Sequence, residues 1–388
     1  MVPKQMRTPG ILLMFHCEQN TGYAIEKLEH TFKEAALKAG FSEDAIHYSY
    51  LQVQQSETNI HQINYWDVAD KQVLKNIVTK YHIQTVLAFD LAFPSWVCSE
   101  AKKAGAKKVI AYWGASMSSL NSGIKLQLKK LEYYFRKKHA ADLYIFESKA
   151  MQQTATQGRG IPENKTTVIP LGVNTNIYKP EITPSFYAHD LFKIPHGRKI
   201  IFYSGHMEPR KGVAVLIECA IELYSTGQHS YHFLICGNKN DEAKPYMEML
   251  SGHKNAAKHV TFAGYRNDIP ELMRSSDIGV IASTGWDSFT MSSVEMLASG
   301  LPLIVSKLQG LQETVIPNIT GEYIEPGNHK ALIQKLNTIL GNPTKHKQYA
   351  TQARERAEAA YSVETQISSL AEHLIPLKHI KTFEKKYD

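Results

Sequence analysis

The stretch DIGVIASTGWDSFTMSSVEMLASGLPLIVS, residues 277–306, contains one complete structural repeat. Its two ends, residues 277–283 and 301–306, are short apolar runs that predict buried strands. Between them, a loop of small and polar residues leads into an apolar helical segment that begins near Met291. Strand, loop, helix and strand in this order predict two parallel strands joined by a crossing helix.

The same alternation continues through most of the chain and is typical of parallel sheets covered by helices. The first half contains predicted strands at residues 10–16, 47–53, 84–90, 108–113, 142–148 and 166–172. The second half contains predicted strands at residues 199–205, 231–237, 259–264, 277–283, 301–306 and 321–326. The sequence therefore predicts an α/β protein with two doubly wound, Rossmann-like domains.

The length of 388 residues agrees with two domains, because one domain usually takes roughly 100 to 200 residues. A proline-rich segment without periodicity separates the two strand series, so we expect a linker at residues 181–197. The first domain is then expected at residues 1–180 and the second at residues 198–360. Residues 361–388 are expected to form a C-terminal helix that packs back toward the first domain.

Composition narrows the class of protein and of partner. The chain is 43% hydrophobic and 21% charged, as in globular proteins. It has no apolar run of ~18 residues and no signal-peptide pattern, so we expect a cytoplasmic protein. Four cysteines without paired spacing indicate neither a zinc site nor a disulfide framework. The net charge of +7 fits an anionic ligand or membrane surface, whereas no nucleic-acid-reading motif is present.

The loop after the first strand of the second domain carries three basic residues between glycines. His206, Arg210 and Lys211 lie between Gly205 and Gly212, just before an amphipathic helix. Free backbone amides at a helix start, with a lysine ammonium beside them, form an anion site. A solvated basic turn is the alternative interpretation of this stretch.

Two acids bracket the helix start that is predicted near residue 291. Asp287 precedes the turn and Glu295 follows one turn into the helix, with the amides of residues 289–292 between them. Those amides suit a diphosphate, while the carboxylates suit hydroxyl groups on either side of it. A nucleotide sugar is such a ligand. Helix capping explains either acid alone, but it does not explain the basic turn at the matching end of another strand.

The segments GHMEPRKG (205–212) and DSFTMSSVEMLASGLPLIVS (287–306) resemble the signature of glycosyltransferase family four, retaining nucleotide-sugar enzymes of the GT-B fold. The resemblance covers residues 160–330 well, and the first half mainly by its order of elements. It implies two Rossmann-like domains facing each other across a cleft. It also implies transfer of a hexose-type sugar from a nucleotide diphosphate sugar, UDP-sugar above all, to an acceptor hydroxyl with retained configuration.

The resemblance assigns roles to individual residues. Lys211 would contact the donor diphosphate, Glu295 the ribose and Asp287 the hydroxyls of the transferred sugar. Gly22 would lie in the first-domain loop that approaches the donor phosphate and acceptor. The backbone amides that line the sugar and phosphate would belong to Phe289, Thr290, Met291 and Ser292.

Several positions depart from the family pattern. His206 stands where the family usually has arginine, and Asp287 where it usually has glutamate. Thr290 replaces a common glycine. Asp90 stands where many relatives carry a histidine near the reaction centre, and Trp113 where a His-Gly pair is frequent.

The predicted chemistry uses no metal and no cofactor besides the donor substrate. The chain lacks an Asp-x-Asp motif, so Lys211, Arg210 and the helix amides are expected to stabilise the charge of the leaving nucleoside diphosphate. Asp90 is the catalytic candidate of the first domain. A front-face route, in which the leaving phosphate oxygen takes the acceptor's proton, needs no protein nucleophile.

The acceptor side is expected in the first domain. Asn20, Tyr23 and Trp113 lie in or near its loops and could shape a pocket for a glycan or a lipid-linked acceptor, although isolated aromatics are more often core. Residues 122–141 predict a basic amphipathic helix. For this helix we favour packing of the apolar side on the sheet, with peripheral docking on an anionic membrane as the alternative.

Other functions remain open at the level of sequence. A nucleotide-sugar epimerase of the same architecture would bind the donor without an acceptor. A catalytically inactive sugar-nucleotide binding protein would agree with the substitutions at His206 and Asp90. A nicotinamide-dependent dehydrogenase is disfavoured, because no Gly-x-Gly-x-x-Gly follows a predicted strand.

Overall fold

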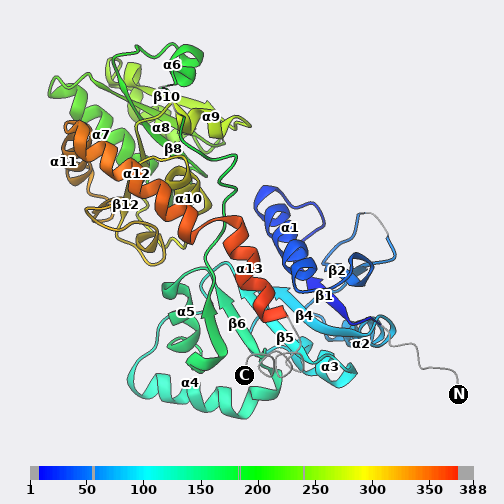
Figure 1. Cartoon of the computed structure of the whole chain (residues 1–388). Coiled ribbons are helices and arrows are strands. Elements are labelled where there is room, and N and C mark those ends of the chain that lie inside the picture. The colour runs from blue at the N-terminus through cyan, green and yellow to red at the C-terminus, as the bar shows by residue number, and fades with distance from the viewer. Residues whose placement is uncertain (1–7, 55–56, 182, 184, 239–240, 375–388) are drawn as a thin grey trace, which may run out of the picture. The chain divides into compact units, whose positions relative to one another are not determined.

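The computed structural model describes residues 8–54, 57–181, 183, 185–238 and 241–374 (Figure 1). The chain divides into two compact units. The first takes in the chain up to Pro170 together with the residues from Glu364 onward, and the second is Leu171–Val363. Among the described residues, no helix is both long and apolar enough to cross a membrane.

The first unit is built on one parallel sheet, whose described strands have the order β3-β2-β1-β4-β5-β6-β7. The strands are β1 Gly10–Met14, β2 Ile46–Tyr50, β3 Ile60–Gln62, β4 Ile83–Phe89, β5 Lys108–Trp113, β6 Leu143–Phe146 and β7 Thr166–Val168. The helices are α1 Tyr23–Lys38, α2 Lys71–Lys80, α3 Trp96–Ala104, α4 Gly123–Arg136, α5 Lys149–Thr156 and α13 Val363–Leu374.

Residues of β1 face the two sides of this sheet alternately, as the two-residue period of a strand requires. Leu12 and Met14 belong to the core cluster that contains α2, α3 and α5 residues. Ile11 and Leu13 belong to the opposite cluster, which contains residues of α1 and α13. Both faces are therefore covered by helices, which explains why the strands are apolar throughout.

The second unit repeats this plan, with the described strands in the order β10-β9-β8-β11-β12-β13. The strands are β8 Lys199–Ser204, β9 Tyr231–Cys236, β10 Val260–Gly264, β11 Ile278–Ile281, β12 Leu303–Ser306 and β13 Gly321–Ile324. The helices are α6 Tyr187–Phe192, α7 Val213–Ser225, α8 Lys244–Ser251, α9 Ile269–Arg274, α10 Met291–Ala298, α11 His329–Leu340 and α12 Pro343–Ala360. The predicted fold class, two doubly wound parallel sheets, is confirmed.

The segment that we expected to be a linker, residues 181–197, lies inside the second unit. It contains α6, whose Ala188 is fully buried and donates its amide to Ser275 Oγ at 3.2 Å. Ile194 is buried in the core cluster of the second unit that also contains Ala188. The chain instead leaves the first unit after Pro170 and returns to it at Glu364, so the units differ from the expected ranges 1–180 and 198–360.

The returning segment packs on the first unit. Leu370 and Leu374 of α13 are fully buried in the cluster that covers one face of the first sheet. Lys108 Nζ donates to His373 O at 2.7 Å, and Thr85 Oγ1 donates to Leu374 O at 3.2 Å. Residues 375–388 of the predicted C-terminal segment 361–388 lie outside the described residues.

The apolar side of α4 does not pack on the sheet, which corrects our expectation for residues 122–141. None of the residues of α4 is buried. Ile124 and Phe135 are 80% and 71% exposed. The helix touches the core through its other side, where the ring of Tyr133 lies 5.2 Å from that of Phe93.

Each sheet has a switch point, where the strand order reverses. In the first unit it lies between β1 and β4, and in the second between β8 and β11. Loops that leave the carboxyl ends of the two strands at a switch point lie side by side, and ligands of doubly wound sheets bind there. The loop after β8 contains Lys211, and the loop after β11 contains Asp287. The topology thus explains why these two residues meet.

Candidate active site

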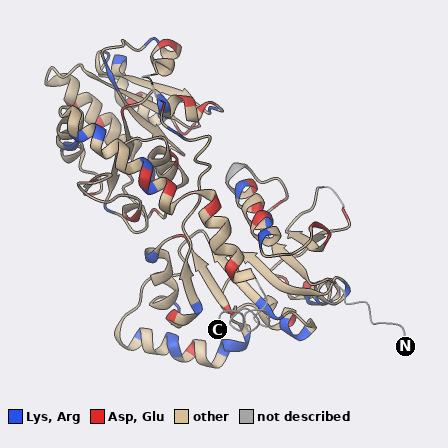
Figure 2. Ribbon diagram, in the orientation of Figure 1, with Lys and Arg blue, Asp and Glu red and all other residues tan. Residues whose placement is uncertain are grey.

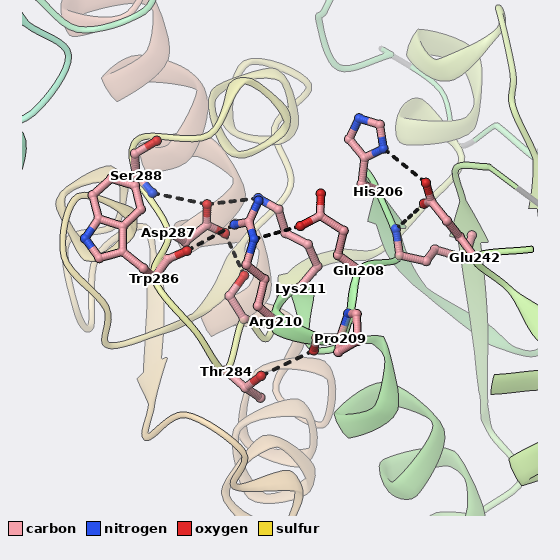
Figure 3. Close-up of polar contacts among 12 residues, drawn as sticks. His206, Glu208, Pro209, Arg210, Lys211, Glu242, Thr284, Trp286, Asp287 and Ser288 are labelled. Atoms are coloured by element: carbon pink, nitrogen blue, oxygen red, sulfur yellow. Dashed lines mark hydrogen bonds and ion pairs between the residues drawn. The ribbon is translucent and has the colours of Figure 1, made fainter. Parts of the chain in front are cut away.

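The loops after β8 and β11 are in direct backbone contact. Figure 3 shows the polar contacts around them. Gly212 ends the first loop and precedes α7 with φ 74°, a conformation that favours glycine. A Cβ atom at Gly212 would lie 1.8 Å from the carbonyl oxygen of Ala282. Only glycine therefore allows the two loops to approach this closely.

Arg210 joins the two loops by both its backbone and its side chain. Its carbonyl oxygen accepts the amides of Thr284 at 2.8 Å and Gly285 at 3.2 Å. Its guanidinium donates to Trp286 O at 3.0 Å and to Glu208 Oε2 at 2.8 Å. These contacts hold the second loop against the basic turn, so Arg210 has a clear structural role in the site.

Lys211 and Asp287 form a largely buried ion pair at the centre of this arrangement. Lys211 Nζ lies 2.9 Å from Asp287 Oδ1, and the two side chains are only 18% and 4% exposed. The carboxylate also accepts from Ser283 Oγ at 2.6 Å and from the amide of Ser288 at 3.1 Å. A buried carboxylate needs such partners, because an unpaired charge in this position would be costly.

Two residues that fix Asp287 were not predicted from the sequence. Ser283 is the last residue of the predicted strand 277–283, and its polar side chain at a carboxyl end is a usable signal. Gln309 accepts the amide of Asp287 through Oε1 at 3.3 Å, from a distant loop. Its place soon after β12, the strand next to β11, is a signal that could have found it.

Helix α10 begins directly after the second loop. Thr290, the N-cap residue of this helix, does not cap it through its side chain. In the described part of the chain, the buried Oγ1 of Thr290 has no hydrogen-bond partner. Met291 and Ser292 are partly exposed, whereas Phe289 is buried against Tyr361, with ring centroids 5.2 Å apart. Phe289 can therefore contact a ligand through its backbone but not through its side chain.

Glu295 lies in the second turn of α10 and is 6% exposed. The same helix begins beside the Lys211–Asp287 pair, because Ser288 bonds Asp287 three residues before Met291. The basic turn, the two predicted acids and the helix start thus belong to one region of the second unit.

His206 lies at the edge of this region. Its side chain is 73% exposed, and its Nδ1 is 3.6 Å from Glu242 Oε1. Glu242 also accepts the amide of Met207 at 2.8 Å, so it fixes the start of the basic turn next to Gly205. Glu242 was not predicted, although its place soon after β9, the strand next to β8, is a signal that could have found it.

The switch point of the first unit carries Asp90. This residue directly follows β4, has φ 52° and accepts the amide of Gly114 through Oδ1 at 3.2 Å. Burial raises the pKa of Asp90 to about 6, although the Gly114 amide partly opposes the shift. Trp113 packs on the core and donates Nε1 to Leu91 O at 3.1 Å, so its side chain supports this loop.

A second acid in the first unit, Glu147, was missed. It directly follows β6 and is 6% exposed. Tyr112 donates its hydroxyl to Glu147 Oε1 at 3.3 Å, and Gln366 of α13 donates to that hydroxyl at 3.3 Å. Burial, and then the charge of Asp90, raise the pKa of Glu147 to about 8. An acid immediately after a wholly apolar strand was the available signal.

The remaining first-unit predictions lie around the start of α1. Gly22 precedes α1 with φ 82°, and no atom lies within 4 Å of the position of a Cβ there. Asn20 has φ 63° and donates to Gln54 Oε1 at 3.4 Å. Tyr23 begins α1, and its side chain is outside the described parts. Across the described residues, no three acid, histidine or cysteine side chains gather as a metal site would require.

Residues 189–356 match the family Glycosyl transferases group 1. This range contains the basic turn, the Lys211–Asp287 pair and all of α10. Most of the second unit is therefore similar to group 1 glycosyltransferases. The resemblance inferred from the two sequence segments is confirmed at this level, whereas membership of family four and the retaining mechanism remain predictions.

Curated proteins that are similar to this chain include glycosyltransferases. A lipopolysaccharide 1,2-N-acetylglucosaminetransferase of Salmonella typhimurium is 24% identical over 214 residues, which is 53% of this chain and 55% of that protein. A phosphatidyl-myo-inositol mannosyltransferase of Mycobacterium leprae is 26% identical over 164 residues, which is 41% of each chain. The chain thus spans about half the length of the curated relatives that it matches.

Solved structures extend the likeness of fold to both units. A glycosyltransferase from Rickettsia africae has a TM-score of 0.77 at 20% identity, covering 97% of this chain and 99% of that one. The HepE protein of Anabaena in complex with UDP has a TM-score of 0.74 at 18% identity, covering 94% and 99%. The predicted GT-B fold is therefore confirmed for this chain.

Proposed function

We propose that the protein is a glycosyltransferase that moves a hexose-type sugar from a UDP-sugar to an acceptor hydroxyl, with retention of configuration and without a metal ion. The observation that carries this proposal is the buried Lys211–Asp287 pair beside the start of α10, at the switch point of a group 1 domain. The HepE structures in complex with UDP and with UDP-glucose support this choice of donor.

Lys211 is suited to bind the donor diphosphate. An ammonium has three N–H donors, and Asp287 accepts from it through Oδ1. The remaining donors are available to phosphate oxygens, and the positive end of the α10 dipole adds to the attraction. As the bond to the sugar breaks, negative charge grows on the diphosphate, and a fixed cation in a protected site stabilises that charge.

Asp287 is suited to hold the transferred sugar. An ionised carboxylate offers about four acceptor positions. Lys211, Ser283 and Ser288 occupy three of them. One position remains for a sugar hydroxyl, and the three contacts hold the carboxylate rigidly for it. Glu295, which is buried in α10, would accept the hydroxyls of the ribose, as the family resemblance implies.

Binding of the acceptor is assigned to the first unit, as the family resemblance implies. The acceptor hydroxyl must lose a proton, and in a front-face reaction the leaving phosphate oxygen receives it, which accounts for retention without a protein nucleophile. Asp90, with its pKa raised to about 6, would be largely ionised at neutral pH and could hold the acceptor hydroxyl in place. Gly22 and Asn20, at the open start of α1, would bind a glycan or a lipid-linked acceptor beside it.

A thermal-shift panel of nucleoside diphosphates tests the donor assignment. A ligand at 100 times its dissociation constant stabilises a protein by about 2.7 kcal/mol, which raises the melting temperature measurably. We expect UDP to give the largest shift, and the same shift in the presence of a chelator. If no nucleoside diphosphate raises the melting temperature, the proposed function is wrong.

Incubation with a UDP-sugar alone separates transfer from epimerisation. A transferase without acceptor gives at most slow hydrolysis to UDP and free sugar, whereas an epimerase gives an isomerised UDP-sugar. Nuclear magnetic resonance of the anomeric proton in a transfer product then tests retention. An inverted anomeric configuration would contradict the front-face route.

A further inference from the structure

Helix α4 presents an apolar stripe to the outside of the first unit. Ile124, Leu128, Leu131 and Phe135 are spaced by four, three and four residues, which places them on one face of a helix. They are 80%, 59%, 52% and 71% exposed. Of the 17 large hydrophobic side chains that are exposed in the described chain, six lie between Leu120 and Phe135, so this face is the main apolar surface of the described residues.

The opposite side of α4 fixes the helix to the protein. Leu126 and Tyr133 are partly buried there, and the ring of Tyr133 lies 5.2 Å from that of Phe93. The backbone of α4 also approaches Gly160 closely, because a Cβ atom at Gly160 would lie 2.4 Å from the amide nitrogen of Lys130. Gly160 has φ 69°, which suits glycine. Both contacts set the rotation of the helix and thereby hold the apolar stripe outward.

Lysine and arginine residues recur along α4 (Figure 2). Residues 122–141 contain six lysine or arginine residues and one glutamate, in a chain whose net charge is +7. Glu132 is neutralised within the helix, since it pairs with Lys129 at 2.7 Å and with Arg136 at 3.5 Å. Lys125 and Lys130 are exposed, one on each side of the stripe. Lys137 and Lys138 continue the charge beyond the end of α4.

We propose that the outer face of α4 docks on an anionic lipid bilayer, with the apolar stripe inserted among the lipids and the flanking cations on the headgroups. A helix with a strong apolar face and a basic polar face lies in the plane of a bilayer surface in this way. Each lysine or arginine near an anionic surface adds to the attraction. This inference concerns a surface remote in sequence from the donor loops and does not rest on the proposed function.

Charge decides between a bilayer and a second copy of the chain. Two copies that paired through this stripe would bring their rows of lysines together, and like charges across an apolar contact oppose association. Glu132 offers no compensation, because Lys129 and Arg136 already pair with it. An anionic bilayer provides both the apolar interior and the opposite charge.

Co-sedimentation with lipid vesicles tests the proposal on the full-length protein. We expect binding to vesicles of phosphatidylcholine with phosphatidylglycerol, little binding to phosphatidylcholine alone, and a strong decrease as salt rises above ~0.15 M, where the Debye length is about 8 Å. Equal binding to both kinds of vesicle, or none to the anionic kind at low salt, would overturn the proposal.

Two sets of variants separate the contributions of charge and apolar contact. Lys125→Glu with Lys130→Glu should lower the partition coefficient on anionic vesicles more than ~10-fold. The matched control, Lys254→Glu with Lys330→Glu, makes the same change in net charge at exposed sites of the second unit and should have a much smaller effect. Ile124→Ser with Phe135→Ser should lower binding to a similar extent, while Val68→Ser with Ile319→Ser should not.

All of these positions are exposed, so the variants are expected to fold, which circular dichroism and the melting temperature check. Nucleotide thermal shifts should be unchanged in every variant. Sedimentation velocity adds a separate readout: a dimer that the Ile124 and Phe135 substitutions abolish would show that a second copy, and not a bilayer, covers the stripe. The two readouts test different proposals. Absence of vesicle binding contradicts membrane docking alone, whereas absence of nucleotide thermal shifts contradicts the proposed function alone.

Discussion

The two units place different chemistry at equivalent positions of the same architecture. At the switch point of the second sheet, the buried carboxylate of Asp287 is paired with Lys211 at 2.9 Å. At the carboxyl edge of the first sheet, Asp90 and Glu147 are buried, and in the described contacts neither meets a lysine or arginine. The second edge therefore pairs its acid with a cation, whereas burial in the first edge raises the pKa of both acids. The topology sets where the loops meet, and the residues in them decide what they bind.

The largest expected effect comes from removing the cation of the second edge. Lys211→Ala should lower turnover of the nucleotide sugar by ~100-fold or more, because the growing charge on the leaving diphosphate loses its fixed partner. It should also destabilise the protein, since Asp287 stays buried without a counter-charge. Release of nucleoside diphosphate measures turnover, and Lys254→Ala, at an exposed site, is the control.

A double variant shows which loss matters for catalysis. Lys211→Ala with Asp287→Asn should recover stability, because no buried charge is left unpaired, without recovering turnover. Full activity in either variant would mean that the two edges do not differ in function as proposed.

The next prediction compares the glycines that precede α1 and α7. Gly22 and Gly212 have φ 82° and 74°, but a Cβ has open space at Gly22 and would lie 1.8 Å from Ala282 O at Gly212. Gly22→Ala should cost about 1 kcal/mol of unfolding free energy through backbone strain alone. Gly212→Ala should cost at least about 2 kcal/mol more, because the two loops must separate. Denaturant unfolding measures both, and equal costs would argue against a tight loop contact in the second unit.

The third prediction uses the pKa of Glu147 in the first unit. Its folded pKa of about 8 is above its ordinary value of 4.5, so between these values the folded state holds a proton that the unfolded state has lost. Stability contributed by protonated Glu147 is therefore lost as pH rises from 4.5 toward 8. Glu147→Gln removes this titration and should become more stable relative to wild type by up to about 1.4 kcal/mol per pH unit across the window.

Urea unfolding at pH 5, 6.5 and 8 is the measurement, since ~1.4 kcal/mol per unit exceeds its usual error. Glu163→Gln, at an exposed site, should keep the wild-type pH profile. Parallel profiles for wild type and Glu147→Gln would mean that burial does not raise the pKa of Glu147.

The smallest expected effect concerns His206, at the rim of the second edge. His206→Arg adds a fixed positive charge where the family usually has one, close to the carboxylate of Glu242. Because the side chain is 73% exposed, we expect affinity for UDP to rise by only ~2- to 5-fold at low salt. Calorimetric titration at low and high salt measures this gain, which should disappear in high salt. A decrease in affinity would show that position 206 does not face the diphosphate.

Sequence periodicity predicted most of the strands and the two loops that meet at the switch point of the second sheet. Apolar runs are unambiguous where both faces of a sheet are covered, as for β4 and β11, whose residues are almost entirely buried. Strand β3 was missed, because Ile60–Gln62 is short, partly exposed and polar at two of its three positions. The meeting of Lys211 and Asp287 could be inferred because loops at a switch point lie together in every doubly wound sheet.

Other features depended on long-range packing that local patterns do not contain. The proline-rich segment at 181–197 lacks a helical period, yet Ala188 is buried in a core cluster that also contains residues of α9 and of several strands. A helical wheel of α4 predicts an apolar stripe, but it does not predict the direction in which the stripe faces. The contacts of Tyr133 and the close approach of Gly160 hold the stripe outward.

The path of the chain has a consequence for biosynthesis. Helix α13 follows the whole second unit in the sequence, yet Leu370 and Leu374 complete the apolar layer on the first sheet. During synthesis, the apolar residues of the first unit that α13 covers therefore stay exposed until Leu171–Val363 has been synthesised. Nascent chains that are stalled before α13 should bind chaperones that recognise hydrophobic surface, at the residues before Leu171. The chaperones should be released once α13 has been synthesised.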